Sequence, residues 1–153
     1  MIETRLPPLA IESLQVGDTL AEVVRGPITR GALALFAGAS GDHTLLHIDS
    51  DYVKAIGLDD VFAHGMLSMA YLAQVVTQAF PSEHLREWSV RFLAITPLHA
   101  TIRCSAEVIE LFEAGGERFA RLQLAARTDS DLATLAGWAV VALGGLAVDV
   151  VER

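Results

Sequence analysis

The chain has 153 residues, 52% of them hydrophobic, and a formal net charge of −8 at pH 7. This length predicts a single domain, residues 1–153, with a substantial core. There is no run of Lys or Arg, which argues against binding nucleic acid or an anionic membrane surface, because both need clustered positive charge. The single cysteine, Cys104, excludes an internal disulfide and a zinc site with several cysteines, and its alternating context predicts a buried structural thiol.

One stretch, residues 132–148, has the apolar character of a membrane span. It carries no charge, but its length is at the lower edge of the roughly 17–25 residues that a spanning helix needs. Glycines interrupt it and no basic residue anchors it, so we expect a buried strand ending in a Gly-Gly turn. The N-terminus has an early acid and no long apolar core, unlike a signal peptide. The chain is therefore predicted to be soluble and cytoplasmic.

The first 60 residues predict short elements separated by turns. The expected elements are an irregular segment over residues 1–17 containing Pro7-Pro8, a strand over residues 19–24, a helix that Thr29 caps and that stops at Gly38 or Gly41, and a short helix over residues 51–56 with Ser50 as its cap and Gly57 at its end.

Residues 65–80 form the longest predicted helix. Apolar side chains cover most of its circumference, and its few polar residues carry no charge. A helix of this kind either spans a membrane or is covered by protein on most sides. Because it is too short to span, we expect a curved sheet around it.

The second half of the chain supplies such a sheet. The predicted strands are residues 88–95, 100–112, 117–127 and 132–143, with hairpin turns at 113–116 and 128–131. A strand, then helices, then four antiparallel strands predict an α+β domain with one long helix held by an antiparallel sheet.

The ionisable residues whose side chains could reach a common point lie between Phe36 and His64. They are Asp42, His43, His47, Asp49, Asp51 and His64. The sequence Ser40-Gly41-Asp42 is typical of a turn, and after His64 the loop becomes an apolar helix. A carboxylate and an imidazole beside a helix N-terminus predict an acid/base site with an anion-binding backbone next to it.

Asp42 and His47 each have a structural alternative. Asp42 alone suits an Asx-turn or a helix cap, and His47 alone, in its apolar context, suits a half-buried structural histidine. The pair is more informative, because a loop with the spacing Gly-Asp-x-x-x-x-His can direct both side chains into one cavity. There they would position a water molecule and move two protons.

A metal site is a second interpretation of the same segment. His43, His47, Asp49 and His64 have suitable ligand types, and two imidazoles with one carboxylate suit non-haem iron. Their spacing follows no helical zinc motif, however. Scattered arginines, namely Arg25, Arg30, Arg86 and Arg91, could meet a phosphate but are also typical of a solvated face.

The start of the long helix predicts a second functional feature. Backbone N–H groups at Gly65 lack partners within the helix and lie at the positive end of its dipole. They can hold a carbonyl oxygen that gains negative charge. The structural alternative is that Gly65 permits close packing at the helix start.

These residues match a known family. Residues 36–47, Phe-Ala-Gly-Ala-Ser-Gly-Asp-His-Thr-Leu-Leu-His, followed by Ala55, resemble the signature of MaoC-like, R-specific enoyl hydratases and dehydratases. Residues 62–67 look like the family's entry to its central helix. The resemblance implies a hotdog fold, which is an antiparallel sheet wrapped around a long helix, in a dimer with sites near the subunit interface.

The resemblance also implies roles for individual residues. Asp42 and His47 match the catalytic pair, and Gly65 matches the glycine whose N–H holds the thioester carbonyl. Together with Gly65, the predicted substrate-binding residues are Ser40, Thr44 and His64. Thr44 and Leu45 stand where the family usually has Asn-Pro, so the bracing of the loop differs.

The expected reaction is reversible hydration of a trans-2-enoyl thioester, or dehydration of a (3R)-3-hydroxyacyl thioester, of CoA or acyl carrier protein. It needs no metal or redox cofactor. The expected assembly is a homodimer or a hetero-oligomer with a related hotdog subunit. One rival is a thioesterase, which the absence of Asp and Glu from His64 to Pro81 opposes. The other is a non-catalytic acyl-binding subunit of a hetero-oligomer, which the retained Asp/His pair opposes but which the change to Thr44-Leu45 keeps open.

Overall fold

A computed structural model describes residues 11–144. Its elements are a 3-10 turn (Ile11–Ser13), β1 (Val23–Arg25), α1 (Arg30–Ser40), α2 (Leu45–Ile48), α3 (Ser50–Ala55), α4 (Gly65–Ala79), a second 3-10 turn (Ser82–His84), β2 (Leu85–Phe92), β3 (Ile102–Ala114), β4 (Glu117–Thr128) and β5 (Ala133–Ala142). The strands form one antiparallel five-stranded sheet in the order β1-β3-β4-β5-β2. The predicted α+β architecture is confirmed.

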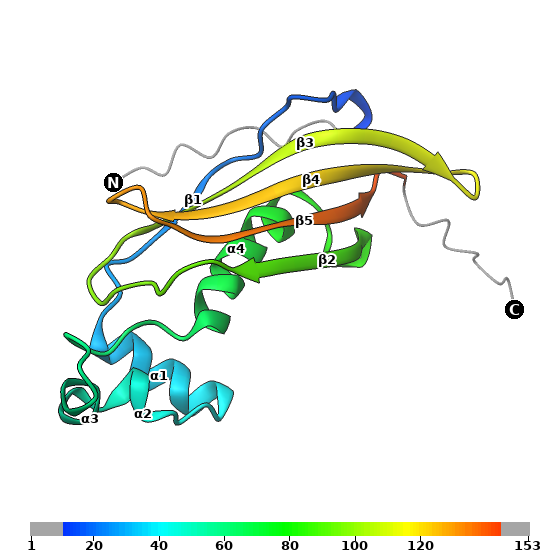
Figure 1. Cartoon of the computed structure of the whole chain (residues 1–153). Coiled ribbons are helices and arrows are strands. Elements are labelled where there is room, and N and C mark those ends of the chain that lie inside the picture. The colour runs from blue at the N-terminus through cyan, green and yellow to red at the C-terminus, as the bar shows by residue number, and fades with distance from the viewer. Residues whose placement is uncertain (1–10, 145–153) are drawn as a thin grey trace, which may run out of the picture.

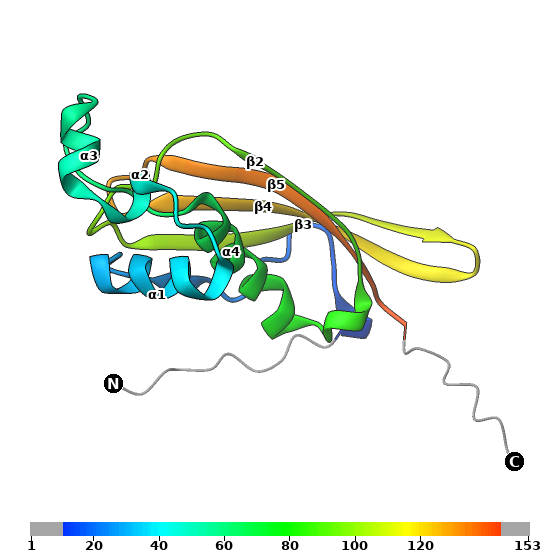
Figure 2. The same ribbon diagram turned by 90° about the horizontal axis from the view of Figure 1, so that it is seen from below.

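The helices lie on one face of the sheet (Figure 1). Helix α4 runs beneath the strands and contacts β1, β3 and β4, while α1, α2 and α3 gather at one end of the molecule. Seen from below, α1 and α4 lie in front of the same sheet face (Figure 2). Within residues 11–144, no helix is both long enough and apolar enough to cross a membrane.

Helix α4 occupies nearly the whole predicted range. Its sheet-facing side buries Leu67, Leu72, Val75 and Val76. The opposite side is less enclosed than expected, because Met66 is 53% exposed. The sheet therefore covers one face of α4, and the opposite face is exposed at Met66, in the first turn of the helix.

Alternating side chains build the core under the sheet. Ile102, Cys104, Ala106 and Val108 of β3 point inward, at most 2% exposed, while their neighbours face solvent, as the period of two requires. Each fully buried branched aliphatic side chain contributes about 1.5–3 kcal/mol. Burial also raises the pKa of the Cys104 thiol to about 12, so this cysteine stays protonated, as expected for a structural thiol.

Glycines allow the sheet to turn and to close. Gly115 and Gly116 have φ of 60° and 81°, so the β3–β4 hairpin uses two left-handed residues at the predicted turn. At Gly137 of β5, a Cβ atom would lie 2.0 Å from the carbonyl oxygen of Ser89 in β2. No side chain fits there, so this glycine permits the close approach of β5 to the edge strand β2.

Helix capping agrees with the sequence at one position and differs at another. Thr29 caps α1 as predicted, because its hydroxyl accepts a hydrogen bond from the Ala32 N–H at 3.1 Å. Helix α3 is capped by Asp49 rather than by Ser50, because Asp49 precedes the helix with extended backbone and accepts from two N–H groups of the first turn. Pro7-Pro8 and the second glycine of the Gly-Gly turn predicted after β5 lie outside the described residues.

Candidate active site

The end of α1 places Asp42 at the start of the site. Gly41 terminates the helix with φ of 75°, and its N–H donates to the carbonyl of Ala37 at 3.0 Å. The Ser40 hydroxyl donates to the Phe36 carbonyl at 2.7 Å and accepts from the Asp42 N–H at 3.2 Å. These contacts fix the direction in which the chain leaves α1.

The Asp42 carboxylate is braced by Thr44. Its Oδ1 accepts hydrogen bonds from the Thr44 hydroxyl at 2.7 Å and from the Thr44 N–H at 3.2 Å. The hydroxyl bond is the main cause that lowers the pKa of Asp42, so the side chain is ionised at neutral pH. Thr44 thus braces this loop at the position where the family that the sequence resembles usually has Asn. Oδ2 has no protein partner among the described residues and is free to bind water or substrate.

His47 lies on the short helix α2, whereas the sequence predicts an irregular loop at this position. Its Nδ1 is 2.8 Å from the backbone carbonyl oxygen of Phe62. Because a carbonyl oxygen only accepts, Nδ1 carries a hydrogen, and in the neutral imidazole the lone pair is therefore on Nε2. The Phe62 ring meets the imidazole edge to face, with centroids 5.0 Å apart. One nitrogen of His47 is therefore anchored and the other is available to take a proton.

Asp42, His47 and His64 converge. Each offers one ligand or proton-carrying atom, and these atoms lie within 4.8 Å of one another. The rings of His47 and His64 stack with centroids 4.0 Å apart. The structure thus brings together the two side chains that the sequence pairs, and adds the histidine that precedes α4.

The metal interpretation changes its residues. Two of the four ligands predicted from the sequence are not in the cluster. Asp49 caps α3, and His43 is exposed to solvent. Within residues 11–144, the one group whose ligand atoms have a suitable spacing is Asp42, His47 and His64. Two imidazoles and a carboxylate are ligands that divalent transition metals accept.

Gly65 lies at the N-terminus of α4 beside a cavity of about 350 Å³. Its N–H has no hydrogen-bond acceptor in the described part of the chain, as expected for a first helical residue. A Cβ atom on Gly65 would come within 2.9 Å of the Phe92 ring, so both predicted roles, a free donor and close packing, meet at this residue. The cavity is lined by Phe62, Ala63, Gly65, Ser68, Phe92, Leu93, Ala94, Ile95, Thr96 and Leu135.

Some parts of the site carry no signal in the sequence. The Phe62 carbonyl orients His47, but a backbone group cannot be recognised from residue types. The buried hydroxyls of Ser68 and Thr96, 3.2 Å apart, contribute a polar patch to the wall of the cavity. The sequence contains one signal for this patch: Ser68 lies one helical turn after Gly65, which places both residues on the same face of the predicted helix.

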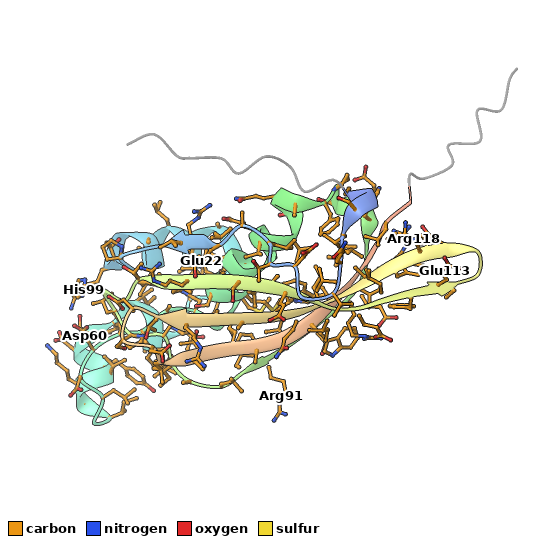
Figure 3. The ribbon with its side chains drawn as sticks, turned by 90° about the horizontal axis from the view of Figure 1, so that it is seen from above. Glu22, Asp60, Arg91, His99, Glu113 and Arg118 are labelled. Carbon is orange, nitrogen blue, oxygen red and sulfur yellow. The ribbon has the colours of Figure 1, made fainter. Side chains whose placement is uncertain are left out.

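The arginines outside the site are mostly occupied. Arg30 pairs with Asp60, Arg86 pairs with Glu117, and Arg25 binds Gln74. In Figure 3, Arg91 projects away from the edge strand β2. Within residues 11–144 neither Arg91 nor Arg25 has an ion pair, and Arg91 also has no side-chain hydrogen bond there.

Comparisons with known proteins agree with this architecture. Residues 13–122 match the family model described as MaoC like domain. A 3-hydroxyacyl-thioester dehydratase Z from Mycobacterium tuberculosis H37Rv is 27% identical over 94 residues, which is 58% of this chain and 62% of that relative. The match thus spans less than two thirds of the relative's length.

Two solved hydratases have the same fold. The (R)-hydratase from A. caviae involved in PHA biosynthesis superposes with a TM-score of 0.75 at 24% identity, over 85% of this chain and 97% of that one. R-hydratase PhaJ1 from Pseudomonas aeruginosa, in its unliganded form, has a TM-score of 0.75 at 25% identity, over 86% and 84%. The family model covers well over half of the sequence, and the chain therefore belongs to the MaoC-like domain family, with a hotdog fold in which α4 packs against the antiparallel sheet.

Proposed function

We propose that this protein is a hydro-lyase that adds water to a trans-2-enoyl thioester, or removes it from a (3R)-3-hydroxyacyl thioester, of CoA or acyl carrier protein. The family and its relatives are hydratases and dehydratases. The observation that carries the proposal is the convergence of an ionised carboxylate, Asp42, with the imidazole of His47, whose Nδ1 is held by the Phe62 carbonyl.

The chemistry requires two proton transfers. In hydration, the oxygen of water bonds to C3 of the enoyl group, one proton leaves the water, and one proton is added at C2. Asp42 and His47 hold the same water and between them perform both transfers, and in dehydration the order reverses. The hydroxyl that leaves the substrate then takes up a proton and departs as water.

Gly65 provides the third requirement, which is polarisation of the thioester carbonyl. As charge moves from C3 towards the carbonyl oxygen, the free Gly65 N–H and the positive end of the α4 dipole stabilise it. Helix α4 has 15 residues, so its N-terminus carries a full dipole effect. This interaction strengthens in the enolate-like transition state, and it therefore raises kcat.

For Ser40, Thr44 and His64, which the sequence assigns to substrate binding, we propose a supporting role in the site. The hydrogen bonds of Ser40 and Thr44 hold the Asp42 loop, which supports a bracing role for both side chains. His64 is enclosed and contacts the other two members of the cluster. None of the three lines the cavity beside Gly65, so in this proposal they act by holding Asp42 and His47 in place.

A second hotdog subunit completes the proposed assembly, as a homodimer or with a related chain. Phe92, Leu93 and Ile95 of the cavity wall and Met66 next to Gly65 are between 50% and 54% exposed, and β2 is an edge strand that pairs with β5 on one side only. Apolar side chains gathered at an open strand edge favour association with another subunit. Sedimentation at micromolar concentration is expected to give a dimer of this chain or, with a partner chain present, a mixed oligomer; a stable monomer in both cases would contradict this.

The reaction is tested by a spectrophotometric assay of the purified protein with crotonyl-, octenoyl- and longer enoyl-CoA thioesters, with and without candidate partner chains. We expect loss of the enoyl absorbance and formation of the (3R)-hydroxyacyl product. Release of free CoA instead would indicate a thioesterase. Binding of acyl-CoA without turnover, with or without partners, would favour the non-catalytic subunit.

A further inference from the structure

His64 is the member of the cluster that solvent does not reach. Its side chain is 1% exposed, although the residue immediately precedes α4. A side chain so enclosed acts through the groups that it touches. These are the Phe36 ring, at a centroid distance of 5.0 Å, the His47 ring at 4.0 Å, and the backbone carbonyl of Asp42.

The hydrogen bond to Asp42 fixes the position of the His64 proton. Nε2 lies 3.1 Å from the Asp42 carbonyl oxygen, and because that oxygen only accepts, Nε2 carries the hydrogen. Nδ1 is buried and has no hydrogen-bond partner in the described chain. A proton on Nδ1 would create a buried cation with an unsatisfied N–H, which costs considerable free energy.

Burial accordingly lowers the pKa of His64, and the hydrogen bond to the Asp42 carbonyl opposes this effect only in part. The titratable groups that act on His64 within residues 11–144 are Asp42 and His47, and α1 contributes the uncharged Phe36 ring. His64 is therefore neutral at physiological pH, with its proton on Nε2.

These contacts connect the segments that the reaction must align. Asp42 follows α1, His47 belongs to α2, and Gly65 begins α4 directly after His64. The stacked ring of His64, at an interplanar angle of 30°, limits the tilt of the His47 imidazole, whereas the Phe62 carbonyl fixes its Nδ1. The direction of the reactive Nε2 of His47 depends on both contacts.

We propose that His64 is a positioning residue: its Nε2–H holds the backbone of Asp42 and its ring face holds the imidazole of His47, so that both proton-carrying groups are aligned beside Gly65 without His64 touching the substrate. The kinetic consequences rest on the proposed function. The structural consequences, which are the protonation of His64 and the placement of His47, do not.

Two variants separate the two contacts. His64→Phe keeps a ring to stack on His47 and loses the N–H, whereas His64→Gln keeps an N–H near the position of Nε2 and loses the ring. We expect His64→Phe to lower kcat by about 10–10²-fold with KM within about threefold, because a misplacement of 1 Å can cost about 10²-fold. His64→Gln should retain more activity than His64→Phe.

His43→Gln is the matched control, since it removes an exposed imidazole next to Asp42, and it should behave as the parent. A His64→Phe enzyme with the parent kcat, or a loss confined to KM, would overturn the proposal. If His64→Phe does not fold, the proposal is tested by kcat and KM of His64→Gln and by the NMR spectra of the parent.

A spectroscopic measurement tests the structural half without substrate. In ¹⁵N NMR of the imidazoles, His64 of the parent should be neutral at pH 7 with its hydrogen on Nε2, and it should take up a second proton only at a lower pH than an ordinary histidine. The ¹⁵N chemical shifts of the His47 ring, which lies 4.0 Å from the His64 ring in the parent, should change in both His64 variants and not in His43→Gln. A protonated His64 at pH 7, a hydrogen on its Nδ1, or unchanged His47 ring resonances in both His64 variants would contradict the proposal. Absence of turnover by the parent would instead refute the proposed function and leave this readout valid.

Discussion

The sheet and the segment from Phe36 to His64 are stabilised in different ways. In the sheet, side chains such as Ile102, Leu122 and Leu135 are at most 1% exposed and share one apolar cluster with Leu72 of α4. That packing is insensitive to the protonation of any side chain. It provides a rigid surface on which α4, and hence the Gly65 N–H, is held.

The segment over residues 36–64 depends on polar contacts instead. Thr44 braces the Asp42 carboxylate, the Phe62 carbonyl orients His47, and the Asp42 carbonyl binds His64. Each contact consists of one or two hydrogen bonds, and a hydrogen bond typically contributes about 0.5–1.5 kcal/mol to stability. Changes in the sheet should therefore reduce stability, whereas changes in this segment should reduce rate at nearly constant stability.

The largest effect is expected at Asp42 and His47. Asp42→Asn and His47→Gln keep the size of each side chain and remove its proton transfer, so each should lower kcat by about 10²–10⁴-fold. Thermal denaturation of both variants should remain close to the parent. A full-activity Asp42→Asn enzyme would show that this carboxylate does not act in the reaction.

In the sheet-facing core, Leu72→Ala should have the opposite profile. Leu72 is 0% exposed, and truncation of such a side chain typically lowers the free energy of unfolding by about 2–5 kcal/mol. Denaturant titration measures this loss, and kcat of the folded enzyme should stay near that of the parent. The matched control is Leu35→Ala in α1, where the side chain is 78% exposed and little change is expected.

At the junction of the two regions, Gly65→Pro removes the proposed carbonyl donor. Proline is tolerated in the first turn of a helix, and loss of one such donor typically costs about 10²–10³-fold in kcat. Gly65→Ala is the control, because it keeps the N–H and introduces the same Cβ against the exposed Phe92 ring. Equal kinetics of the two variants would show that the donor is unimportant and that only the contact with Phe92 matters.

A smaller effect should appear in the pH dependence of Thr44→Val. The Thr44 hydroxyl is the leading cause of the lowered pKa of Asp42, so its loss should raise that pKa towards the ordinary value. Because Asp42 must be ionised, activity that the parent retains as pH falls should be lost at a higher pH in the variant. Thr44→Ser keeps the hydroxyl and should have the parent profile of kcat/KM; a shift of the same size in both variants would disprove the role of this bond.

The smallest effect is expected for His43→Gln and for chelation. His43 is exposed and lies outside the cluster, so its loss should leave activity nearly unchanged. EDTA should likewise have no effect, because the proposed steps use only protein groups and water. Activity that EDTA abolishes and added metal restores would make Asp42, His47 and His64 metal ligands and replace the proposed mechanism.

The sequence predicts the scaffold better than the site. Helix α4 ends one residue before its predicted end, and β4 begins at Glu117 as expected, because apolar periodicity is a local property of the chain. Strand β2 is shifted towards the N-terminus, to Leu85–Phe92, since nothing in its composition marks where it leaves the sheet.

In the site, residue types identify Asp42 and His47 but not what surrounds them. The α2 turn that carries His47, the Phe62 carbonyl that orients it, and the enclosure of His64 all depend on contacts between segments distant in the chain. Asp49 shows the same limit on a smaller scale, because it and Ser50 are both good caps and only the backbone decides between them.

The most direct test of the account is a double-mutant cycle of enoyl-CoA hydration with Asp42→Asn, His47→Gln and the combined variant. If both groups act on one water, the combined variant should be far less impaired than the product of the two single effects, because groups that act as a unit are not additive. Single effects that multiply in the combined variant would mean that Asp42 and His47 act independently, and would contradict a shared acid/base site.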